Sequence, residues 1–308
     1  MSTSGNNNNS GSINSPLRNI EYAVLRADPG DTIIIRGGTY LEMVKAYGVN
    51  GTPSAPIIVT AYPGELVVVI SNDWAGFDIA SSSWLIVDNL TIRNAPSDGI
   101  YITNAHHITV RNCKVYNNGG VGIHILSSRG PASDNTVQNN EVHDNNHEGI
   151  YADVKRSNPA AVDNNLIENN IITGNGYDGV QNTNENGVAP YPAGTTIRGN
   201  YVENNGGWAT MDLAGNNLTI KDNTVINRYS NAGAVYYAHG NGSVISGNTI
   251  YNYYRDWSGG DAIVIRDVYE SMIEDNTIIS TISGSVGIRV YQPAEVILRN
   301  NDITIGGN

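Results

Sequence analysis

Alternating apolar and polar residues recur along the chain in seven-residue segments that all share one pattern. Successive segments begin 23 to 30 residues apart, an interval typical of one coil of a solenoid. The segments are IVDNLTI (86–92), TVRNCKV (109–115), TVQNNEV (136–142), LIENNII (166–172), TIRGNYV (196–202), TIKDNTV (219–225), VISGNTI (244–250), MIEDNTI (272–278) and ILRNNDI (297–303). Alternation with period two predicts a β-strand in each segment, and helical periodicity is absent from them.

A second short apolar run follows most of these segments and predicts a second strand in each coil. These runs are DGIYI (98–102), VGIHI (121–125), EGIYA (148–152), DGVQN (178–182), ATMDL (209–213), GAVYY (233–237), DAIVI (261–265) and VGIRV (286–290). Two short strands per repeat indicate coils that stack in parallel, at about the ordinary inter-strand spacing of 4.8 Å.

The fifth position of the seven-residue segments is asparagine in all but the first two. The residues are Leu90, Cys113, Asn140, Asn170, Asn200, Asn223, Asn248, Asn276 and Asn301. Stacked asparagine amides can hydrogen-bond from coil to coil, which predicts a buried ladder at one turn. The sequence therefore predicts an all-β, single-domain, right-handed parallel β-helix, a solenoid of about ten coils with an Asn ladder.

The two ends of the chain differ in pattern. Residues 1–14 are polar and predict a flexible linker, so that the β-helix domain covers 15–308. Ser15 and Pro16 are typical of a helix start, and an apolar stripe follows them at helical spacing, which predicts a short N-terminal capping helix. The residues of the stripe are Leu17, Ile20, Ala23, Val24 and Ala27. Residues 300–308 stop in mid-pattern, and we expect a further C-terminal domain to cover that edge.

Composition narrows the classes of partner. The chain of 308 residues has 29 acidic and 17 basic residues and a net charge of −12, which disfavours a nucleic-acid partner. The single cysteine, Cys113, excludes a disulfide framework. Apolar runs are all shorter than the roughly 18 residues of a membrane span.

The segments LRADPGDTIIIRGGTYLEMV (25–44) and GTPSAPIIVTAYPGELVVVI (51–70) resemble the opening of the pectate-lyase-like superfamily of polysaccharide-degrading β-helices, and its pectate and alginate lyases above all. The resemblance implies that Glu148 and Asp178 match two Ca²⁺ ligands of one such lyase family. Tyr177 and Gln181 stand where that family has two further carboxylates. Calcium is therefore a possible cofactor, with Glu148 and Asp178 as its ligands.

Period-two geometry predicts which side chains of the second strands point outward. The expected outward column is Tyr101, His124, Tyr151, Gln181, Asp212, Tyr236, Val264 and Arg289. We expect Glu148 and Asp178 to lie one above the other beside this column, and Asp153 and Arg266 to project at its other edge. Each of these residues also fits a plain structural role, such as a solvated turn.

Their chemistry predicts a polysaccharide-cleaving site. The candidate catalytic residues are Asp153, Lys155, Arg156, Asp178 and Asp212, with Lys155 or Arg156 as a base or as a cation for a uronate carboxylate. The candidate substrate-binding residues are His124, Tyr151, Gln181, Trp208, Tyr236, His239 and Arg266.

The leading hypothesis is an extracellular or cell-surface enzyme that cleaves an anionic, uronate-containing polysaccharide, by β-elimination in preference to hydrolysis. A glycoside hydrolase that uses paired carboxyl groups on the same scaffold is the alternative. A non-catalytic β-helix that binds glycans, such as a cell-surface or tail-spike module, is a third hypothesis from a different class, because a fold alone does not fix a function.

Overall fold

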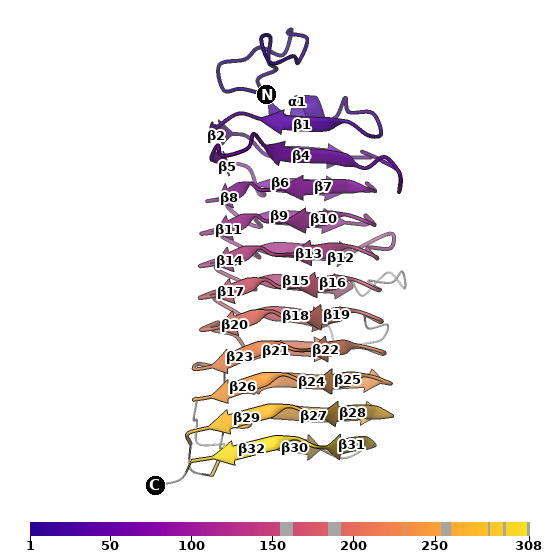
Figure 1. Ribbon diagram of the computed structural model, residues 1–308, viewed down its shortest axis with the longest axis vertical. Coiled ribbons are helices and arrows are strands. Elements are labelled where there is room, and N and C mark those ends of the chain that lie inside the picture. Colours follow the sequence, from indigo (N-terminus) through magenta and orange to yellow (C-terminus); the bar gives the residue numbers. More distant parts are fainter. Residues whose placement is uncertain are drawn as a thin grey trace.

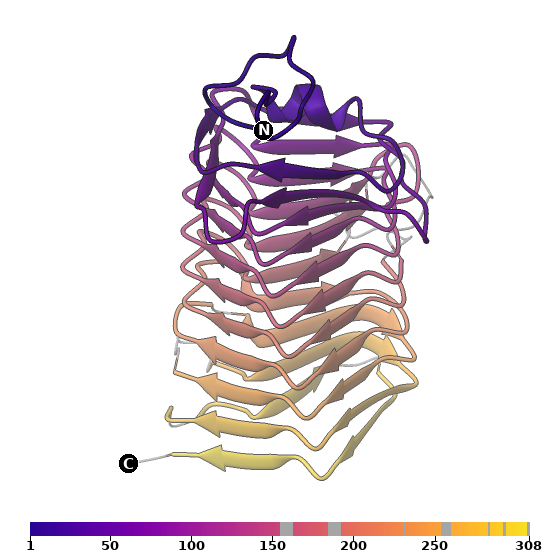
Figure 2. The ribbon, with the colours of Figure 1, turned by 45° about the horizontal axis from the view of Figure 1, so that its top comes forward.

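The chain winds into a right-handed parallel β-helix, as the sequence predicts (Figures 1 and 2). The computed structural model describes residues 1–154, 163–183, 192–230, 232–253, 260–282, 284–291 and 294–306. In this part of the chain, two sheets have 11 strands each and a third has 10, and every strand pairs in parallel with the equivalent strand of the next coil.

Each sheet takes one strand from successive coils. The first sheet contains β1 (Thr32–Ile35), β4 (Ile57–Ala61), β7 (Leu85–Asp88), β10 (Thr109–Arg111), β13 (Thr136–Gln138), β16 (Leu166–Glu168), β19 (Thr196–Arg198), β22 (Thr219–Lys221), β25 (Val244–Ser246), β28 (Ser271–Glu274) and β31 (Val296–Arg299). The second sheet contains β2 (Gly38–Leu41), β5 (Val67–Ile70), β8 (Thr91–Arg93), β11 (Lys114–Tyr116), β14 (Glu141–His143), β17 (Ile171–Thr173), β20 (Tyr201–Glu203), β23 (Thr224–Asn227), β26 (Thr249–Asn252), β29 (Thr277–Ser280) and β32 (Asp302–Ile305). The third sheet contains β3 (Val44–Tyr47), β6 (Phe77–Ala80), β9 (Ile100–Thr103), β12 (Ile123–Ser127), β15 (Ile150–Val154), β18 (Val180–Thr183), β21 (Ala209–Ala214), β24 (Gly233–Asn241), β27 (Ile263–Tyr269) and β30 (Ile288–Tyr291).

The coils have three strands where the sequence predicts two, because each seven-residue segment is split in its middle. The residue before the ladder position has a left-handed backbone, with φ of 54° at Asn112, 55° at Asn139 and 54° at Asn169. Asparagine tolerates this conformation better than most residues, and one such residue between two extended stretches turns the chain sharply. The segment therefore contributes one strand to the first sheet and one to the second.

The core is the interior of the solenoid, filled by the inward residues of all three sheets. In the third sheet, Ile123, Ile150 and Val180 stack in register and are fully buried. Burying one such aliphatic side chain stabilises a fold by about 1.5–3 kcal/mol, so the repeated column is the main source of stability.

The predicted Asn ladder is confirmed and runs from Asn140 to Asn301. Each amide donates Nδ2–H to the Oδ1 of the next coil, at 3.0 Å from Asn140 to Asn170 and 3.0 Å from Asn170 to Asn200. The same Nδ2 also donates to a backbone carbonyl, which for Asn170 is that of Val137 at 2.9 Å. The ladder thus supplies partners for polar groups that the turn would otherwise bury unpaired.

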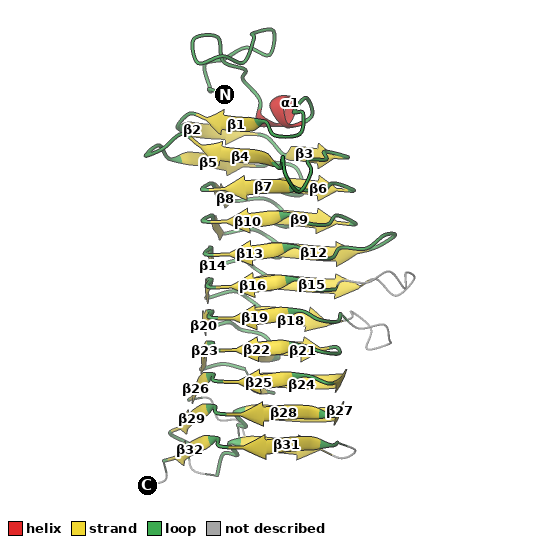
Figure 3. Cartoon of the chain, turned by 45° about the vertical axis from the view of Figure 1, so that its right-hand side comes forward, coloured by secondary structure: helices red, strands yellow, loops and turns green. Residues whose placement is uncertain are grey.

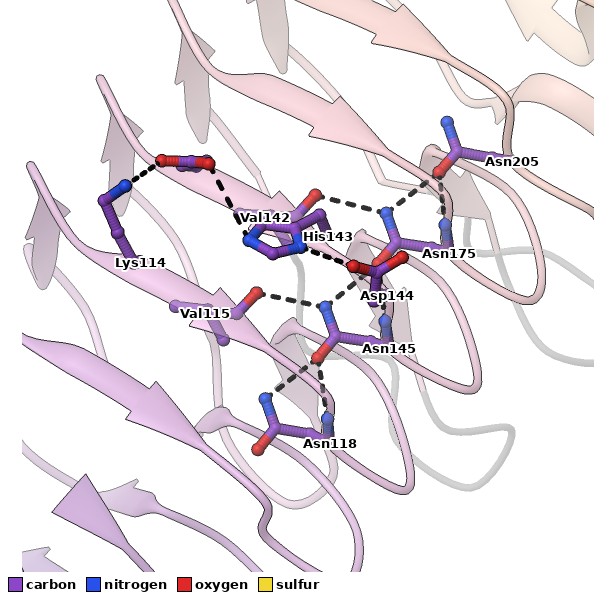
Figure 4. Close-up of polar contacts among 10 residues, drawn as sticks. Lys114, Val115, Asn118, Val142, His143, Asp144, Asn145, Asn175 and Asn205 are labelled. Carbon is purple, nitrogen blue, oxygen red and sulfur yellow. Dashed lines mark hydrogen bonds and ion pairs between the residues drawn. The ribbon is translucent and has the colours of Figure 1, made fainter. Parts of the chain in front are cut away.

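A second ladder, which the sequence interpretation missed, holds the turn before the third sheet (Figure 4). Asn118 donates to Asn145 at 2.8 Å, Asn145 to Asn175 at 2.9 Å, and Asn175 to Asn205 at 2.8 Å. All four amides are buried. The four residues occupy equivalent places in successive coils, but they lie in a turn outside the seven-residue segments, where the strand pattern does not reveal them.

A short helix, α1 (Ile20–Val24), covers the first coil, as predicted, but it begins at Ile20 and not at Pro16. The N-cap Asn19 makes no side-chain cap, and the carboxylate of Glu42 accepts the N–H groups of Ile20 at 3.0 Å and Glu21 at 3.1 Å instead. This cap satisfies the first free N–H groups of the helix. Glu42 is far from the helix in the sequence, so the residues around the helix start do not predict it.

Residues 1–14, expected to be a linker outside the fold, reach the first coil. The amino group of Met1 donates to the carbonyl of Ile34 at 2.8 Å, and the N–H of Arg36 donates to the carbonyl of Met1 at 3.0 Å. Met1 is buried, so the start of the chain adds to the N-terminal cap. No helix in the described residues is long and apolar enough to cross a membrane.

Replacing Asn170 with alanine tests the ladder. The change removes two donated bonds and leaves the N–H and Nδ2 of Asn140 without their acceptor. Because unpaired buried polar groups cost about 1–3 kcal/mol each, we expect a loss of about 3–5 kcal/mol in the free energy of unfolding, measured by denaturant titration. The control Asn72→Ala, at an exposed loop position, should change it by less than about 0.5 kcal/mol. Equal stability of the two variants would contradict a stabilising ladder.

Candidate functional site

Strands β12, β15, β18, β21 and β24 of the third sheet stack in this order along the solenoid (Figure 3), and their pairing aligns the outward column as predicted. His124 pairs with Tyr151, Tyr151 with Gln181, Gln181 with Asp212, and Asp212 with Tyr236. Successive members come from β12, β15, β18, β21 and β24, so residues far apart in the sequence become neighbours about 4.8 Å apart along the solenoid axis.

A groove of ≈ 630 Å³ runs along this column. Its lining residues are Ser97, Asp98, Val121, His124, His147, Glu148, Tyr151, Gln181, Thr183, Asp212, Leu213, Ala214, Tyr236, Ala238 and His239. These described lining residues include three carboxyl groups and three imidazoles, and neither lysine nor arginine. The groove is therefore a polar channel whose charge depends on the protonation of acids and histidines.

His124 is held in a fixed orientation by Asp98. Its Nδ1 lies 3.0 Å from Oδ2 of Asp98, whose Oδ1 accepts the N–H of Val121 at 2.9 Å. This contact orients the imidazole with Nδ1 toward the carboxyl group of Asp98 and Nε2 on the other side of the ring. Nε2 is buried and has no hydrogen-bond partner among the described residues.

Tyr151 stacks on His124, with ring centroids 5.1 Å apart and an angle of 6° between the ring planes. Tyr101 meets the other side of His124 edge-on, at 5.2 Å. Burial, and next the negative charge of Asp153, raise the pKa of the Tyr151 hydroxyl far above its ordinary value. Tyr151 is thus a neutral phenol.

Gln181 and Asp212 form the centre of the groove. The Nε2 of Gln181 donates to Oδ2 of Asp212 at 3.2 Å. Burial and the charge of Glu148 together raise the pKa of Asp212 to about 6, against the opposing effect of this hydrogen bond. Asp212 therefore changes from acid to carboxylate near neutral pH.

Asp178 lies below the groove surface. It is 3% exposed, and its Oδ1 accepts the N–H of Ala209 at 3.0 Å. Burial and the charge of Asp212 raise its pKa to about 8. Burial is also the main cause of the raised pKa of Glu148, which does line the groove.

One contact recurs between coils of the third sheet. An acid two positions before an inward residue reaches the outward residue of the next strand, as in Asp98 with His124 and in Asp261 with Arg289. Asp178 and Asp212 occupy the same two positions, since Val180 pairs with Met211. In this coil the base is replaced by a second acid, and the charge of Asp212 adds to burial in raising the pKa of Asp178.

The structure brings some predicted site residues into the groove and leaves others out of its lining. His124, Glu148, Tyr151, Gln181, Asp212, Tyr236 and His239 line it. Asp153 is 3% exposed and is not a lining residue. Trp208 is exposed at the rim, and Arg266 is exposed on β27, where its Nε lies 3.6 Å from Asp267. The predicted residues Lys155 and Arg156 lie outside the described residues.

Asp98 and His147 are groove residues that the sequence interpretation missed. Asp98 lies in DGIYI, the same position that Glu148 and Asp178 occupy in later coils. That equivalence was a usable signal, because an acid at this position faces the next outward side chain. His147 has no comparable signal, since it lies in a turn whose course depends on the second Asn ladder.

The described residues do not fit the calcium site that the resemblance implies. Calcium takes six to eight oxygen ligands, and no group of three or more His, Cys, Asp or Glu in the described ranges is arranged to hold a metal ion. Asp178 uses one oxygen for Ala209, and Tyr177 is half exposed beside it. Calcium dependence therefore stays a prediction, and no chemistry below passes through a metal.

Comparisons with known proteins agree with this architecture. The family model described as "Pel9A-like, right handed beta helix region" matches residues 1–242. The chain is 37% identical over 81 residues to "Pectate lyase PEL9" of Emericella nidulans, a match that covers 25% of this chain and 19% of that protein. The chain thus aligns with about a fifth of the length of that relative.

Solved structures of similar fold carry different activities. The A-module of the mannuronan C-5 epimerase AlgE4 from Azotobacter vinelandii is 14% identical, with a TM-score of 0.67 over 92% of this chain and 89% of that chain. A lacto-N-biosidase from Eubacterium ramulus is 15% identical, with a TM-score of 0.57 over 99% of this chain and 67% of that one. These likenesses show the fold alone. By the match over residues 1–242, the chain belongs to the Pel9A-like right-handed β-helix family.

Proposed function

We propose that the chain is a carbohydrate-active enzyme that binds a uronate-containing polysaccharide along the groove and cleaves it by β-elimination. Membership of the Pel9A-like family and the similarity to a pectate lyase support this reaction class. Such polymers occur outside cells, and we expect the protein to act there.

The arrangement of Asp98, His124 and Tyr151 is the observation that carries the proposal. β-Elimination needs a base that removes the C5 proton of the uronate and an acid that protonates the leaving glycosidic oxygen. His124, with Nδ1–H held by Asp98, presents Nε2 as the base. Tyr151 lies against it as a neutral phenol. Nε2 of His124 would have to become accessible for this, since it is buried in the free protein.

The reaction balances with these two groups. The C5 proton passes to Nε2 of His124, and the C5–H electron pair forms the C4–C5 double bond. The C4–O bond breaks, and the leaving oxygen takes a proton from Tyr151. The imidazole has then gained one proton and the phenol has lost one, and exchange with solvent restores both.

Gln181 and Asp212 are placed to hold the uronate carboxylate. The amide of Gln181 is a neutral donor, and Asp212 becomes a second donor when it is protonated, below about pH 6. Hydrogen bonds to this carboxylate lower the energy of the negative charge that develops when C5 loses its proton. An ionised Asp212 would instead repel the substrate.

Glycoside hydrolysis is the second candidate, and the raised pKa values of the carboxyl groups favour it. A hydrolase needs one protonated carboxyl group as acid and one carboxylate as base. Asp178, with a pKa of about 8, and Asp212, with a pKa of about 6, would divide these roles at neutral pH. Asp178 would have to become accessible for this, since it is 3% exposed.

The two reactions give different products. We expect incubation with pectate or alginate to produce ultraviolet absorbance from an unsaturated uronate, and His124→Ala to lower kcat by about 10²–10⁴-fold. New reducing ends without this absorbance would show that the enzyme hydrolyses the polymer and does not eliminate. Binding of the polymer without either product would show a glycan-binding module and no enzyme.

An assay of the same activity in the presence of a chelator tests the calcium prediction, since a calcium-dependent enzyme loses its activity when the ion is removed.

The pH dependence of Asp212 gives a second test. In the wild type, kcat/KM should fall by up to about tenfold per pH unit above pH 6, as Asp212 ionises. Asp212→Asn keeps a neutral donor at every pH and should remove this fall. An unchanged profile in Asp212→Asn would show that another group controls activity in this range.

The raised pKa of Asp178 predicts a pH-dependent stability. A carboxyl group whose pKa is about 8 when folded and 3.8 when unfolded binds its proton more tightly in the folded state. Stability is therefore lost as pH rises from about 4 to 8, by up to about 6 kcal/mol. Asp178→Asn, which preserves the acceptor for Ala209, should flatten this decline in thermal unfolding between pH 5 and 8. If the thermal stability of both proteins declines equally with pH, a group other than Asp178 causes the decline.

A further inference from the structure

Three exposed rings stand in consecutive coils at one rim of the groove. His147, Tyr177 and Trp208 each lie three positions before the inward residue of a third-sheet strand. His147 is exposed, Tyr177 is 51% exposed and Trp208 is 57% exposed. We call these three residues the aromatic rim.

Backbone hydrogen bonds join each rim residue to a neighbouring coil. The N–H of His147 donates to the carbonyl of Gly120 at 3.1 Å, and the N–H of Tyr177 donates to that of His147 at 3.2 Å. The carbonyl of Trp208 accepts the N–H of Ala232 at 2.9 Å. The rings of His147 and Tyr177 are 5.1 Å apart, tilted at 45°. Trp208 meets Tyr236 of the groove edge-on at 6.4 Å, so the rim joins the groove wall.

The second Asn ladder fixes the rim in place. Asn145, Asn175 and Asn205 lie two or three residues before the three rings and bond to one another through buried amides (Figure 4). The N–H groups of Asn146, Gly176 and Gly206, which follow the ladder residues, also bond to the preceding coil. The rings are therefore exposed but held on an ordered backbone, which lowers the entropy cost of binding a ligand.

We infer that the aromatic rim binds the polysaccharide by stacking on about three consecutive sugar residues. This inference rests on the proposed function and names the surface that holds the chain beside the acid centre. Sugar rings have apolar faces with hydroxyl groups at their edges. Tyrosine, tryptophan and histidine match this pattern with a flat ring and a polar atom.

The surroundings favour a sugar chain as the occupant. A sugar chain presents one flat apolar face per residue, which matches a single row of three rings in successive coils. The equivalent positions on either side are Ser97 and Gly120 in earlier coils and Ala232 and Gly260 in later ones. Rings thus occupy three coils, and the spacing of about 4.8 Å per coil is close to the length of one sugar residue.

Variants of Tyr177 and Trp208 test the rim, because both side chains are exposed and their loss should leave the fold intact. We expect Tyr177→Ala and Trp208→Ala each to raise KM for the cleaved polysaccharide roughly three- to tenfold, with kcat unchanged. Tyr177→Phe, which keeps the ring, should retain the wild-type KM. Tyr269→Ala, a 41% exposed tyrosine on β27, is the matched control and should behave as the wild type.

Chain length and fluorescence extend the test. Affinity for oligosaccharides of the cleaved polymer should rise up to about three sugar residues, and their binding should change tryptophan fluorescence in the wild type but much less in Trp208→Phe. If the wild type is active and KM is unaltered in both alanine variants, the aromatic rim does not bind the polysaccharide. The proposed function would then still stand. A wild type that neither binds nor cleaves any uronate polymer would overturn both.

Discussion

Every feature of the candidate site depends on coils that pair in parallel at a fixed register. The register is enforced because a slip by one residue would move each Asn amide out of its ladder and turn every buried side chain of the third sheet toward solvent. The ladder bonds between Asn140, Asn170 and Asn200 are buried and have no water to replace them. The buried Asn amides are costly to leave unpaired, and they therefore specify the register of the coils more strictly than apolar packing alone would.

Because the register is fixed, the same pair of positions recurs in each coil of the solenoid and can hold residues of different chemistry. One pair of positions, an acid before one strand and the outward residue of the next, yields an oriented imidazole at Asp98 and His124 and an ion pair at Asp261 and Arg289. With two acids, the same pair of positions holds the carboxyl groups of Asp178 and Asp212, whose pKa values rise. The scaffold sets the distance between the two side chains. The residue that faces the acid then decides whether the pair is a structural contact or a reactive one.

The sequence predicted the parts that follow from period two and from repetition. The outward column from His124 to Tyr236 and the first Asn ladder were found because strand alternation and a repeated letter suffice to locate them. The second ladder at Asn145 and the cap that Glu42 places on α1 were not found, because each depends on how a turn is routed in space. Burial of Asp153 was likewise hidden, since a strand pattern does not show what covers its outward end.

Electrostatics provides the remaining constraint on the proposed reaction. An ionised groove containing Asp98, Glu148 and Asp212 would repel an anionic polymer, and the described lining residues offer no lysine or arginine to offset this. Burial raises the pKa of Glu148 and of Asp212, and a protonated carboxyl group can donate a hydrogen bond to a uronate carboxylate. The raised pKa values therefore reduce the negative charge of the groove as the pH falls, which weakens its repulsion of an anionic chain.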